Sequence, residues 1–317
     1  MKIAFQMDPI NFVDVNADSS FRLAEEAQAR GHRLFYYSPD KLAFQEGKLI
    51  ARGHKMEVQR VPDHPAILSA EEEVWLEDFD VIWLRQDPPF DMHYITTTHL
   101  LDMVHPKTLV VNDPFWVRNY PEKLLVLNFP ALTPPTTIAR DIETIRTFKE
   151  KHKDIILKPL YGNGGAGVFR LDTNDRNLSS LHELFASFSR EPLIAQKFLP
   201  DVSNGDKRVI LVEGKPVGAI NRIPAKGETR SNMHVGGRPE KVGLTQRDIE
   251  ICDAIGPLLS EKGQIFVGID IIGDYLTEIN LTSPTGIQEL ERFDYINVAS
   301  MVWAAIEKRC KRDHVCL

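Results

Sequence analysis

The sequence GIDIIGDYLTEIN, residues 268–280, predicts two β-strands joined by a tight turn. Asp270 lies on the first predicted strand, and Glu278 and Asn280 lie on the second. Because residues i and i+2 of a strand point to the same face, Glu278 and Asn280 share a face. Two carboxylates and an amide supply oxygen donors, which suit a hard cation such as Mg²⁺. The alternative from this segment alone is a surface hairpin whose polar side chains point outward.

The length of the turn determines whether Asp270 belongs to the same site. A three-residue loop over 273–275 places Asp270 opposite Glu278, on the same face of the hairpin. A two-residue turn would place Asp270 opposite Thr277 and point it away. The cation site therefore predicts an odd-length or bulged turn at Gly273.

The composition limits the class of protein. A chain of 317 residues predicts two or three compact units, and 43% hydrophobic residues are typical of a soluble globular protein. The net charge of −7 argues against a nucleic-acid or anionic-membrane partner. No stretch approaches the ~18 apolar residues of a membrane span, and the N-terminal residues lack an apolar core of signal-peptide length. Three cysteines without a CxxC pair or zinc spacing fit a reducing cytoplasm.

The first third of the chain alternates strand and helix patterns, which predicts a small parallel sheet covered by helices. The first helix has an N-cap cluster at Asp18-Ser19-Ser20 and a natural stop at Gly31. A domain boundary is expected near Tyr120-Pro121. The predicted strands cover 3–7, 34–37, 81–84 and 109–112, and the predicted helices cover 18–30 and 95–104.

The rest of the chain predicts further strands and helices. Thr245 and Asp248 form a capping-box pattern that starts a helix ending at Lys262. A long polar, Gly- and Arg-containing loop is expected over 225–240, and loops of that length are usually functional or disordered. The other predicted helices cover 122–128, 142–152, 178–188 and 295–309, and the other predicted strands cover 155–158, 168–171, 193–196, 208–212 and 217–222.

The segment GNGGAG, residues 162–167, literally satisfies the dinucleotide pattern GxGxxG. That pattern requires a following helix, whereas 168–171 is β-branched, aromatic and short, so a dinucleotide site is disfavoured. A Walker A motif is also absent. The glycines let backbone N–H groups approach phosphate oxygens and let the loop close as a flap. The alternative is a plain hairpin turn.

Basic side chains accompany this loop. Lys158 ends the preceding strand and Lys123 lies in the short helix upstream, where a lysine can neutralise phosphates. Arg208 and Arg222 each lie beside apolar residues in neighbouring antiparallel strands, which costs stability unless they meet anions. They predict a site for a triphosphate or a developing phosphoryl transition state. The alternative is a surface ladder paired with nearby carboxylates.

The chain resembles the bacterial glutathione synthetases, a family of ATP-grasp ligases, over residues 1–309. The resemblance implies an α/β (α+β) fold: an N-terminal parallel-sheet domain over 1–120, followed by a two-lobed ATP-grasp fold. The lid subdomain with the Gly-rich loop would cover 121–200, the large subdomain with the metal site 201–310, and a flexible tail 311–317. The matching blocks are MDPI at 7–10, DSS at 18–20, RQDPPFD at 85–91, IILKPL at 155–160, GETR at 227–230 and the segment 269–285.

The resemblance also implies roles for single residues. ATP phosphates would be contacted by Lys123, Lys158, Arg208 and Arg222, of which the two arginines would be catalytic, and by the loop glycines Gly162, Gly164 and Gly165. The backbone of Gln196, Lys197, Phe198 and Leu199 would hold adenine, with Asp206 near the nucleotide. Two Mg²⁺ ions, which Mn²⁺ can replace, would be bound by Asp270, Glu278 and Asn280. The substrate-side residues would be Asp18, Ser19, Arg85, Arg230, Asn232, Gly236, Gly237, Ser283 and Thr285. Two residues depart from the family pattern, Asn163 in place of Met and Gly286 in place of Cys.

The implied reaction joins γ-glutamylcysteine to glycine at the expense of ATP, through an acylphosphate, in a cytoplasmic homotetramer. One rival is another ATP-grasp carboxylate–amine ligase, such as a D-alanine–D-alanine ligase. A second rival is a nucleotide-binding protein that keeps the fold without turnover. The Arg85 block and the turn at 283–285 favour glutathione synthesis over the first rival, and the complete set of Asp270, Glu278 and Asn280 argues against the second.

Overall fold

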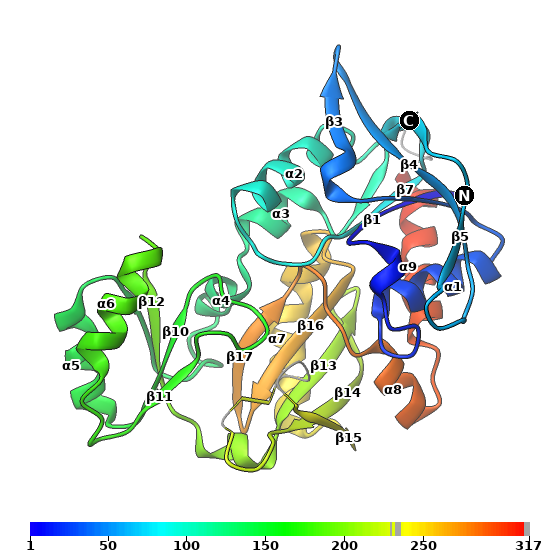
Figure 1. The fold of residues 1–317 in the computed structure, drawn as a ribbon. Helices are drawn as coiled ribbons and strands as arrows, with labels where there is room; N and C mark the ends of the chain where they lie inside the picture. Colours follow the sequence, from blue (N-terminus) through cyan, green and yellow to red (C-terminus); the bar gives the residue numbers. More distant parts are fainter. Residues whose placement is uncertain (229, 232–235, 314–317) are drawn as a thin grey trace.

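The computed structural model describes residues 1–228, 230–231 and 236–313 of the chain. Its strands form three β-sheets, with eight, four and five strands. Figure 1 shows the four-stranded sheet and helices α5 and α6 as a lobe set apart from the other two sheets. Among the described residues, no helix combines the length and apolar character needed to cross a bilayer.

Four parallel strands form one side of the eight-stranded sheet, in the order β2-β1-β7-β8, with β8 at the edge. They read as continuous apolar runs because both of their faces are covered. As predicted, Asp18 caps the first helix by accepting a hydrogen bond from the Phe21 N–H, and Gly31 follows the helix with a φ of +78°. The elements are β1 (Lys2–Met7), β2 (Arg33–Tyr37), β7 (Val81–Arg85) and β8 (Leu109–Val111), with helices α1 (Ser19–Ala29), α2 (Met92–Asp102) and α3 (Pro114–Asn119).

The predicted parallel strands of the N-terminal sheet are confirmed, and residues 42–75 add antiparallel strands that were not predicted. The added strands are β3 (Leu42–Gln45), β4 (Lys48–Val58), β5 (Ala66–Leu68) and β6 (Glu72–Trp75). Glu46 and Gly47 both have positive φ, as a two-residue hairpin turn between twisted strands requires. Three of these strands are only three or four residues long, and strands this short show too little alternation to be predicted.

The four-stranded sheet is antiparallel throughout, in the order β11-β10-β12-β9. Ile145 and Leu178, one from each of its helices, pack on Ile155 and Leu157 of the sheet. All predicted elements of this part are confirmed, and β9 is an addition. The elements are α4 (Glu122–Leu125), β9 (Thr136–Ala139), α5 (Ile142–His152), β10 (Ile155–Pro159), β11 (Phe169–Leu171), α6 (Leu178–Phe188) and β12 (Leu193–Lys197).

The five-stranded sheet is also antiparallel, in the order β15-β14-β13-β16-β17. The capping box of Thr245 and Asp248 starts helix α7 as predicted, and α7 buries Ile251 and Ile255 against the sheet. Strand β15 corrects the predicted loop over 225–240, whose last three residues are part of it. The elements are β13 (Asp206–Val212), β14 (Lys215–Ile223), β15 (Arg238–Val242), α7 (Gln246–Glu261), β16 (Phe266–Ile272) and β17 (Tyr275–Asn280).

The β16–β17 hairpin has the register that the cation site requires, because Asp270 pairs with Glu278. The predicted three-residue loop is wrong, since the turn holds only residues 273–274. A β-bulge leaves Thr277 as the extra residue, and its hydroxyl donates to the carbonyl oxygen of Asp270 at 3.1 Å. The bulge restores the register that a two-residue turn alone would lose, and it lies at Thr277 rather than at Gly273.

The C-terminal segment forms two helices, α8 (Ile287–Asp294) and α9 (Val298–Asp313), instead of the single predicted helix over 295–309. Tyr295 ends α8 in the left-handed conformation, with a φ of +55°. Trp303 of α9 is fully buried, and its ring lies 6.5 Å from that of Phe5 and 6.0 Å from that of Trp83. The last helix therefore packs on the N-terminal sheet rather than on the five-stranded sheet alone.

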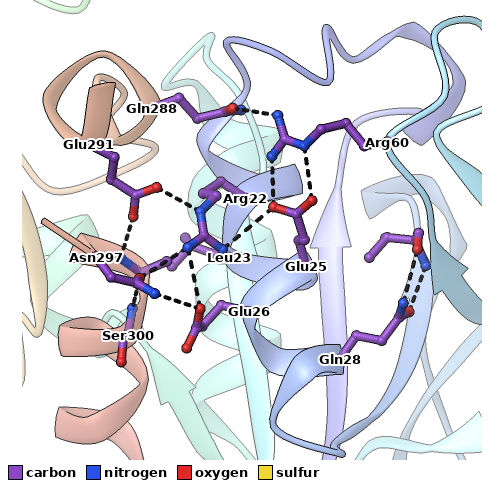
Figure 2. A network of polar contacts seen from close by, with 12 residues as sticks. Arg22, Leu23, Glu25, Glu26, Gln28, Arg60, Gln288, Glu291, Asn297 and Ser300 are labelled. Atoms are coloured by element: carbon purple, nitrogen blue, oxygen red, sulfur yellow. Dashed lines mark hydrogen bonds and ion pairs between the residues drawn. The ribbon is translucent and has the colours of Figure 1, made fainter. Parts of the chain in front are cut away.

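A polar network ties α1 to the two C-terminal helices (Figure 2). The Arg22 guanidinium donates to Glu291 at 2.7 Å, to Asn297 at 3.0 Å and to Glu26 at 3.3 Å. Arg60 extends the network by donating twice to Glu25 and once to Gln288 of α8. Because α1 and α8 begin close to residues of the predicted substrate site, this network fixes two sides of that site.

Replacing Glu26 by glutamine is expected to destabilise the protein by about 1–2 kcal/mol at pH 7. Burial raises the pKa of Glu26, but hydrogen bonds from Asn297 and Arg30 outweigh it and hold the pKa below the usual 4.5. The charged form is therefore favoured by folding, so its contribution is present above pH 4.5 and is lost as the pH falls below that value. Thermal melts of both proteins at pH 7 and at lower pH check this, and a difference that grows on acidification would contradict it.

Candidate active site

An open cleft of about 880 Å³ is lined by residues of the four-stranded sheet, the five-stranded sheet and the Gly-rich loop. Helix α4 packs against β17 at the edge of this cleft. It joins the lobe of the four-stranded sheet to the rest of the molecule. Much of the predicted nucleotide and metal site therefore meets in one place. The predicted residues that line the cleft are Lys123, Lys158, Gly162, Gly164, Gly165, Gln196, Lys197, Phe198, Leu199, Asp206, Arg230, Asp270 and Glu278.

Two arginines and two aspartates form a buried ion network beside the cleft. Arg208 donates to both carboxylate oxygens of Asp270, at 2.5 and 3.0 Å. Arg222 lies 3.0 Å from Asp270 and 2.7 Å from Asp206. The register explains the pairing, because Arg208 lies opposite Asp270 across β13 and β16, and Asp206 lies opposite Arg222 across β13 and β14. The arginines are thus paired with carboxylates, as in the alternative considered from sequence, but they are buried rather than on the surface.

The pKa values of the two aspartates of this network shift in opposite directions. Burial raises the pKa of Asp270, but Arg208 and Arg222 outweigh it and hold the pKa well below its usual range. Burial of Asp206 outweighs the attraction of Arg222, so its pKa is raised. One oxygen of Asp206 accepts from the Ser231 hydroxyl at 2.8 Å, and the other has no hydrogen-bond partner within the described residues. A buried acceptor without a donor indicates a place for a ligand.

Glu278 holds two lysines that come from different elements. The Nζ atoms of Lys123 on α4 and Lys158 at the end of β10 lie 3.6 and 3.5 Å from the same oxygen of Glu278. Burial raises the pKa of Glu278, but the two lysines outweigh it and lower the pKa. Burial lowers the pKa of Lys158 despite Glu278. Lys123 also donates to the carbonyl oxygen of Gly162, which ties α4 to the Gly-rich loop.

The predicted metal donors lie together. Asp270 and Glu278 are paired across the hairpin, and the Asn280 amide donates to Asp270 at 3.3 Å. Within the described residues, no group of three or more His, Cys, Asp and Glu side chains could hold a metal ion. The protein therefore offers two carboxylates and one amide here, and ligand oxygens would have to complete a coordination shell.

The segment predicted to hold adenine is partly engaged within the fold. The Lys197 N–H donates to the Pro135 carbonyl, and the Phe198 N–H donates to the Asp154 carbonyl, both at 2.9 Å. An adenine ring in this part of the cleft would have to use the other backbone groups of 196–199. The Gln196 side chain donates to the Thr136 hydroxyl at 3.0 Å, which joins β12 to β9.

Arg85 differs from the other predicted substrate-side residues, because one of its nitrogen atoms keeps an open hydrogen-bond position within the described residues. Arg85 is buried, with an exposed fraction of 3%, and donates to the Ser20 hydroxyl at 2.8 Å and to the Pro284 carbonyl at 3.2 Å. Its Nη1 has no hydrogen-bond partner within the described residues. Burial lowers the pKa of Arg85. The turn at 283–285 links this arginine to the cleft, because the Thr285 carbonyl accepts from Arg208 at 3.4 Å.

Other predicted substrate-side residues make hydrogen bonds within the fold. Ser19 accepts a hydrogen bond from the Ile287 N–H at the start of α8, and Ser283 donates to the Gln86 carbonyl. Arg230 lies away from Arg85, because it donates to the Gly165 carbonyl at 3.4 Å and to Glu228 at 2.6 Å. Gly236 and Gly237 are outside the set of residues that line the cleft, and Asn232 lies outside the described residues.

Three residues near the site escaped sequence reasoning. Glu122 is half-buried beside Lys123 and accepts from the Thr282 hydroxyl at 2.7 Å, and burial raises its pKa. Thr277, the bulge residue, lines the cleft, as does Ser231. A half-buried carboxylate directly before a predicted site lysine leaves no signal in a single sequence.

Comparisons with known proteins agree with this geometry. The model of the prokaryotic glutathione synthetase N-terminal domain matches residues 1–118, and that of the ATP-grasp domain of the same family matches 122–295. A glutathione synthetase of Brucella melitensis is 58% identical over 98% of this chain and 99% of its own. One from Agrobacterium fabrum is 57% identical over 98% and 97%, and one from Vibrio parahaemolyticus is 43% identical over 98% and 99%.

Solved structures resemble the fold at low sequence identity. The crystal structure of D-cycloserine synthetase DcsG has a TM-score of 0.70 at 13% identity, covering 98% of this chain and 100% of its own. A RimK-domain ATP-grasp protein from Sphaerobacter thermophilus has a TM-score of 0.64 at 17% identity, covering 95% and 98%. These likenesses confirm the predicted fold, an N-terminal α/β domain followed by an ATP-grasp domain. With two family models covering most of the sequence and relatives of up to 58% identity among those described, this chain belongs to the prokaryotic glutathione synthetase family.

Proposed function

We propose that this chain ligates γ-glutamylcysteine to glycine with ATP, giving glutathione, ADP and phosphate. The observation that carries the proposal is a set of four buried cations in or directly beside one cleft, near a buried, partly unpartnered arginine. Among the described residues, the four cations share only three carboxylates, Glu278, Asp270 and Asp206, so a polyphosphate would supply the further negative charge. The sources of the cations are α4, β10, β13 and β14, and the residues are Lys123, Lys158, Arg208 and Arg222.

The nucleotide would lie between the two lobes. Lys123 on α4 and Lys158 on β10 both contact Glu278, so the two lysines would neutralise phosphates bound beside this carboxylate. The Gly-rich loop would cover the phosphates with its backbone N–H groups. The open oxygen of Asp206 would accept a hydrogen bond from the nucleotide. The three sheets support the division into an N-terminal domain over 1–120 and ATP-grasp subdomains over 121–200 and 201–310.

The donor set fits Mg²⁺, which we propose as the cofactor in two copies, with Mn²⁺ as a substitute. Asp270, Glu278 and Asn280 present hard oxygen donors from paired strands. Arg208 donates to both oxygens of Asp270. For Asp270 to serve as a metal ligand, Arg208 would have to contact phosphate instead. When bound, Mg²⁺ would neutralise phosphate charge and orient the γ-phosphoryl group.

The chemistry requires activation of a carboxylate, which is a poor electrophile. Transfer of the γ-phosphoryl group to the cysteinyl carboxylate would make an acylphosphate, and attack by the glycine amine would then release phosphate. Arg208 and Arg222 would stabilise the charge that develops on the transferred group. The remaining task of the chain is to hold the reactants in line and to exclude water.

The dipeptide would extend from the cleft to Arg85. The unpartnered Nη1 of this arginine would donate to a carboxylate of γ-glutamylcysteine, and the turn at 283–285 would bring the other end to Arg208. Both ends of the dipeptide would then be recognised by buried guanidinium groups.

The test measures phosphate release and product mass with purified protein and MgATP. Release that requires γ-glutamylcysteine and glycine together, with glutathione as the product, is the expected result. Release with D-alanine alone would favour a different carboxylate–amine ligase. No release with any acceptor would favour a nucleotide-binding protein without turnover. We also propose a homotetramer in the cytoplasm on the basis of the family, and light scattering after size exclusion tests the tetramer.

Replacing Arg85 by lysine is expected to raise the KM for γ-glutamylcysteine about 10- to 100-fold. Lysine keeps the charge but loses the fork that reaches Ser20, Pro284 and the dipeptide together. The KM for ATP and the kcat should change little, because the arginine binds the ground state and the transition state alike. Steady-state kinetics with each substrate varied check this. A fall in kcat at unchanged KM would contradict the assignment.

A further inference from the structure

The Gly-rich loop touches the N-terminal domain through a pair of aromatic rings. Tyr161, directly before the loop, stacks on Phe90, with ring centroids 5.8 Å apart and planes inclined by 28°. Phe90 in turn packs on Tyr94 at 5.2 Å, and Tyr94 is fully buried. Neither the predicted nucleotide contacts nor the predicted dipeptide contacts use this pair.

Polar contacts with two further segments, α4 and the residues that follow β14, also hold the loop. Lys123 donates to the Gly162 carbonyl, and Arg230 donates to the Gly165 carbonyl. Gly164 and Gly165 have positive φ, so the loop backbone readily adopts other conformations. Tyr161 thus provides an aromatic contact between the start of the loop and the N-terminal domain, through Phe90 and the buried Tyr94.

Phe90 belongs to the segment that carries the dipeptide site. Arg85 lies five positions before it, and the Gln86 carbonyl between them accepts from the Ser283 hydroxyl at 2.9 Å. A small pocket lies beside the ring pair, and Lys123, Gly162 and Asn163 line both this pocket and the proposed nucleotide cleft. The ring pair thus lies at the junction of the two proposed sites.

We propose that Tyr161 is a positioning residue that couples closure of the Gly-rich loop to the dipeptide-binding segment through Phe90. This inference rests on the proposed function. A stacked aromatic pair shifts closure toward the docked loop by about tenfold. A loop that is not docked admits water, which attacks the acylphosphate carbonyl and returns the carboxylate and free phosphate. The net reaction of that side path is ATP hydrolysis, and no peptide bond forms.

The experiment measures the ratio of phosphate released to glutathione formed, with γ-glutamylcysteine, glycine and MgATP. The expected ratio is near one for the wild-type protein and at least about twofold higher for Tyr161→Ala, with a raised KM for ATP. Tyr161→Phe keeps the ring and should stay near one. Phe188→Ala is the matched control, because Phe188 is 73% exposed at the end of α6 in the same lobe.

A double-mutant cycle makes the test specific to the pair. Phe90→Leu keeps an apolar contact with Tyr94 but removes the stack, so it should raise the ratio as Tyr161→Ala does. The double variant should then add little to either single change. A ratio near one in Tyr161→Ala, equal uncoupling by Tyr161→Phe, or independent effects in the cycle would overturn the inference. A wild-type protein that forms no glutathione would instead overturn the proposed function.

Discussion

Replacing Glu278 by glutamine is expected to lower the turnover with γ-glutamylcysteine, glycine and MgATP by at least about 1,000-fold. Glutamine has the shape of glutamate but lacks the charge that a hard cation and two lysines require. Lys123 and Lys158 share one oxygen of Glu278, so the same carboxylate sets the positions of both lysines that we propose to bind phosphate. A phosphate-release assay measures the loss. Normal turnover of this variant would show that the metal and phosphate assignments are wrong.

Loss of this charge also leaves two buried lysines without their partner, so the fold must be checked separately. Glu213→Gln is the matched control, because Glu213 holds Arg309 through two contacts of 2.5 and 2.7 Å away from the cleft. It should lose stability but keep turnover. Circular dichroism and thermal melts of both variants separate unfolding from lost chemistry, and the Glu278 variant should keep its native spectrum.

The hairpin illustrates what a sequence can predict about a site. The need to place Asp270 and Glu278 on one face predicted their pairing correctly, because a shift by one residue turns every side chain to the other face. Of the two predicted options, an odd-length or a bulged turn at Gly273, the structure has a bulge, but the bulge lies at Thr277. The position of this bulge depends on how the whole strand pairs within the sheet. The alternation of residues around the turn therefore does not predict it.

Ion pairs between distant strands were harder to foresee. Arg208 and Asp270 are 62 positions apart and become neighbours only because β13 lies beside β16. The sequence indicated that buried arginines must meet anions, but local patterns do not show which carboxylates will supply them. Helix α8 was missed for a similar reason, since it is short and starts after Gly286 in a left-handed conformation.

Replacing Arg222 by lysine is expected to lower kcat about 100- to 1,000-fold while the KM for γ-glutamylcysteine changes far less. Burial lowers the pKa of Arg222, but Asp206 and Asp270 outweigh it and raise the pKa, so the group stays charged throughout the working pH range. Lysine keeps that charge between the two buried aspartates, whereas alanine would remove the ion-pair partner of Asp206 and one of the two arginine partners of Asp270. The lost element is the planar fork, which can hold a carboxylate and a phosphoryl oxygen at once.

The same exchange at Arg309 provides the control for Arg222→Lys. Arg309 also donates through Nε and Nη2, in its case to Glu213, so lysine there removes an equivalent fork at a site with no proposed role in catalysis. The control should keep the wild-type kcat, and thermal melts should show comparable stability for the two variants. An effect of Arg222→Lys confined to KM would place this arginine in substrate binding. A loss confined to kcat would mean that the planar fork of Arg222 is needed when charge develops on the transferred phosphoryl group. If positive charge alone were sufficient, the lysine in the same place would support the wild-type kcat.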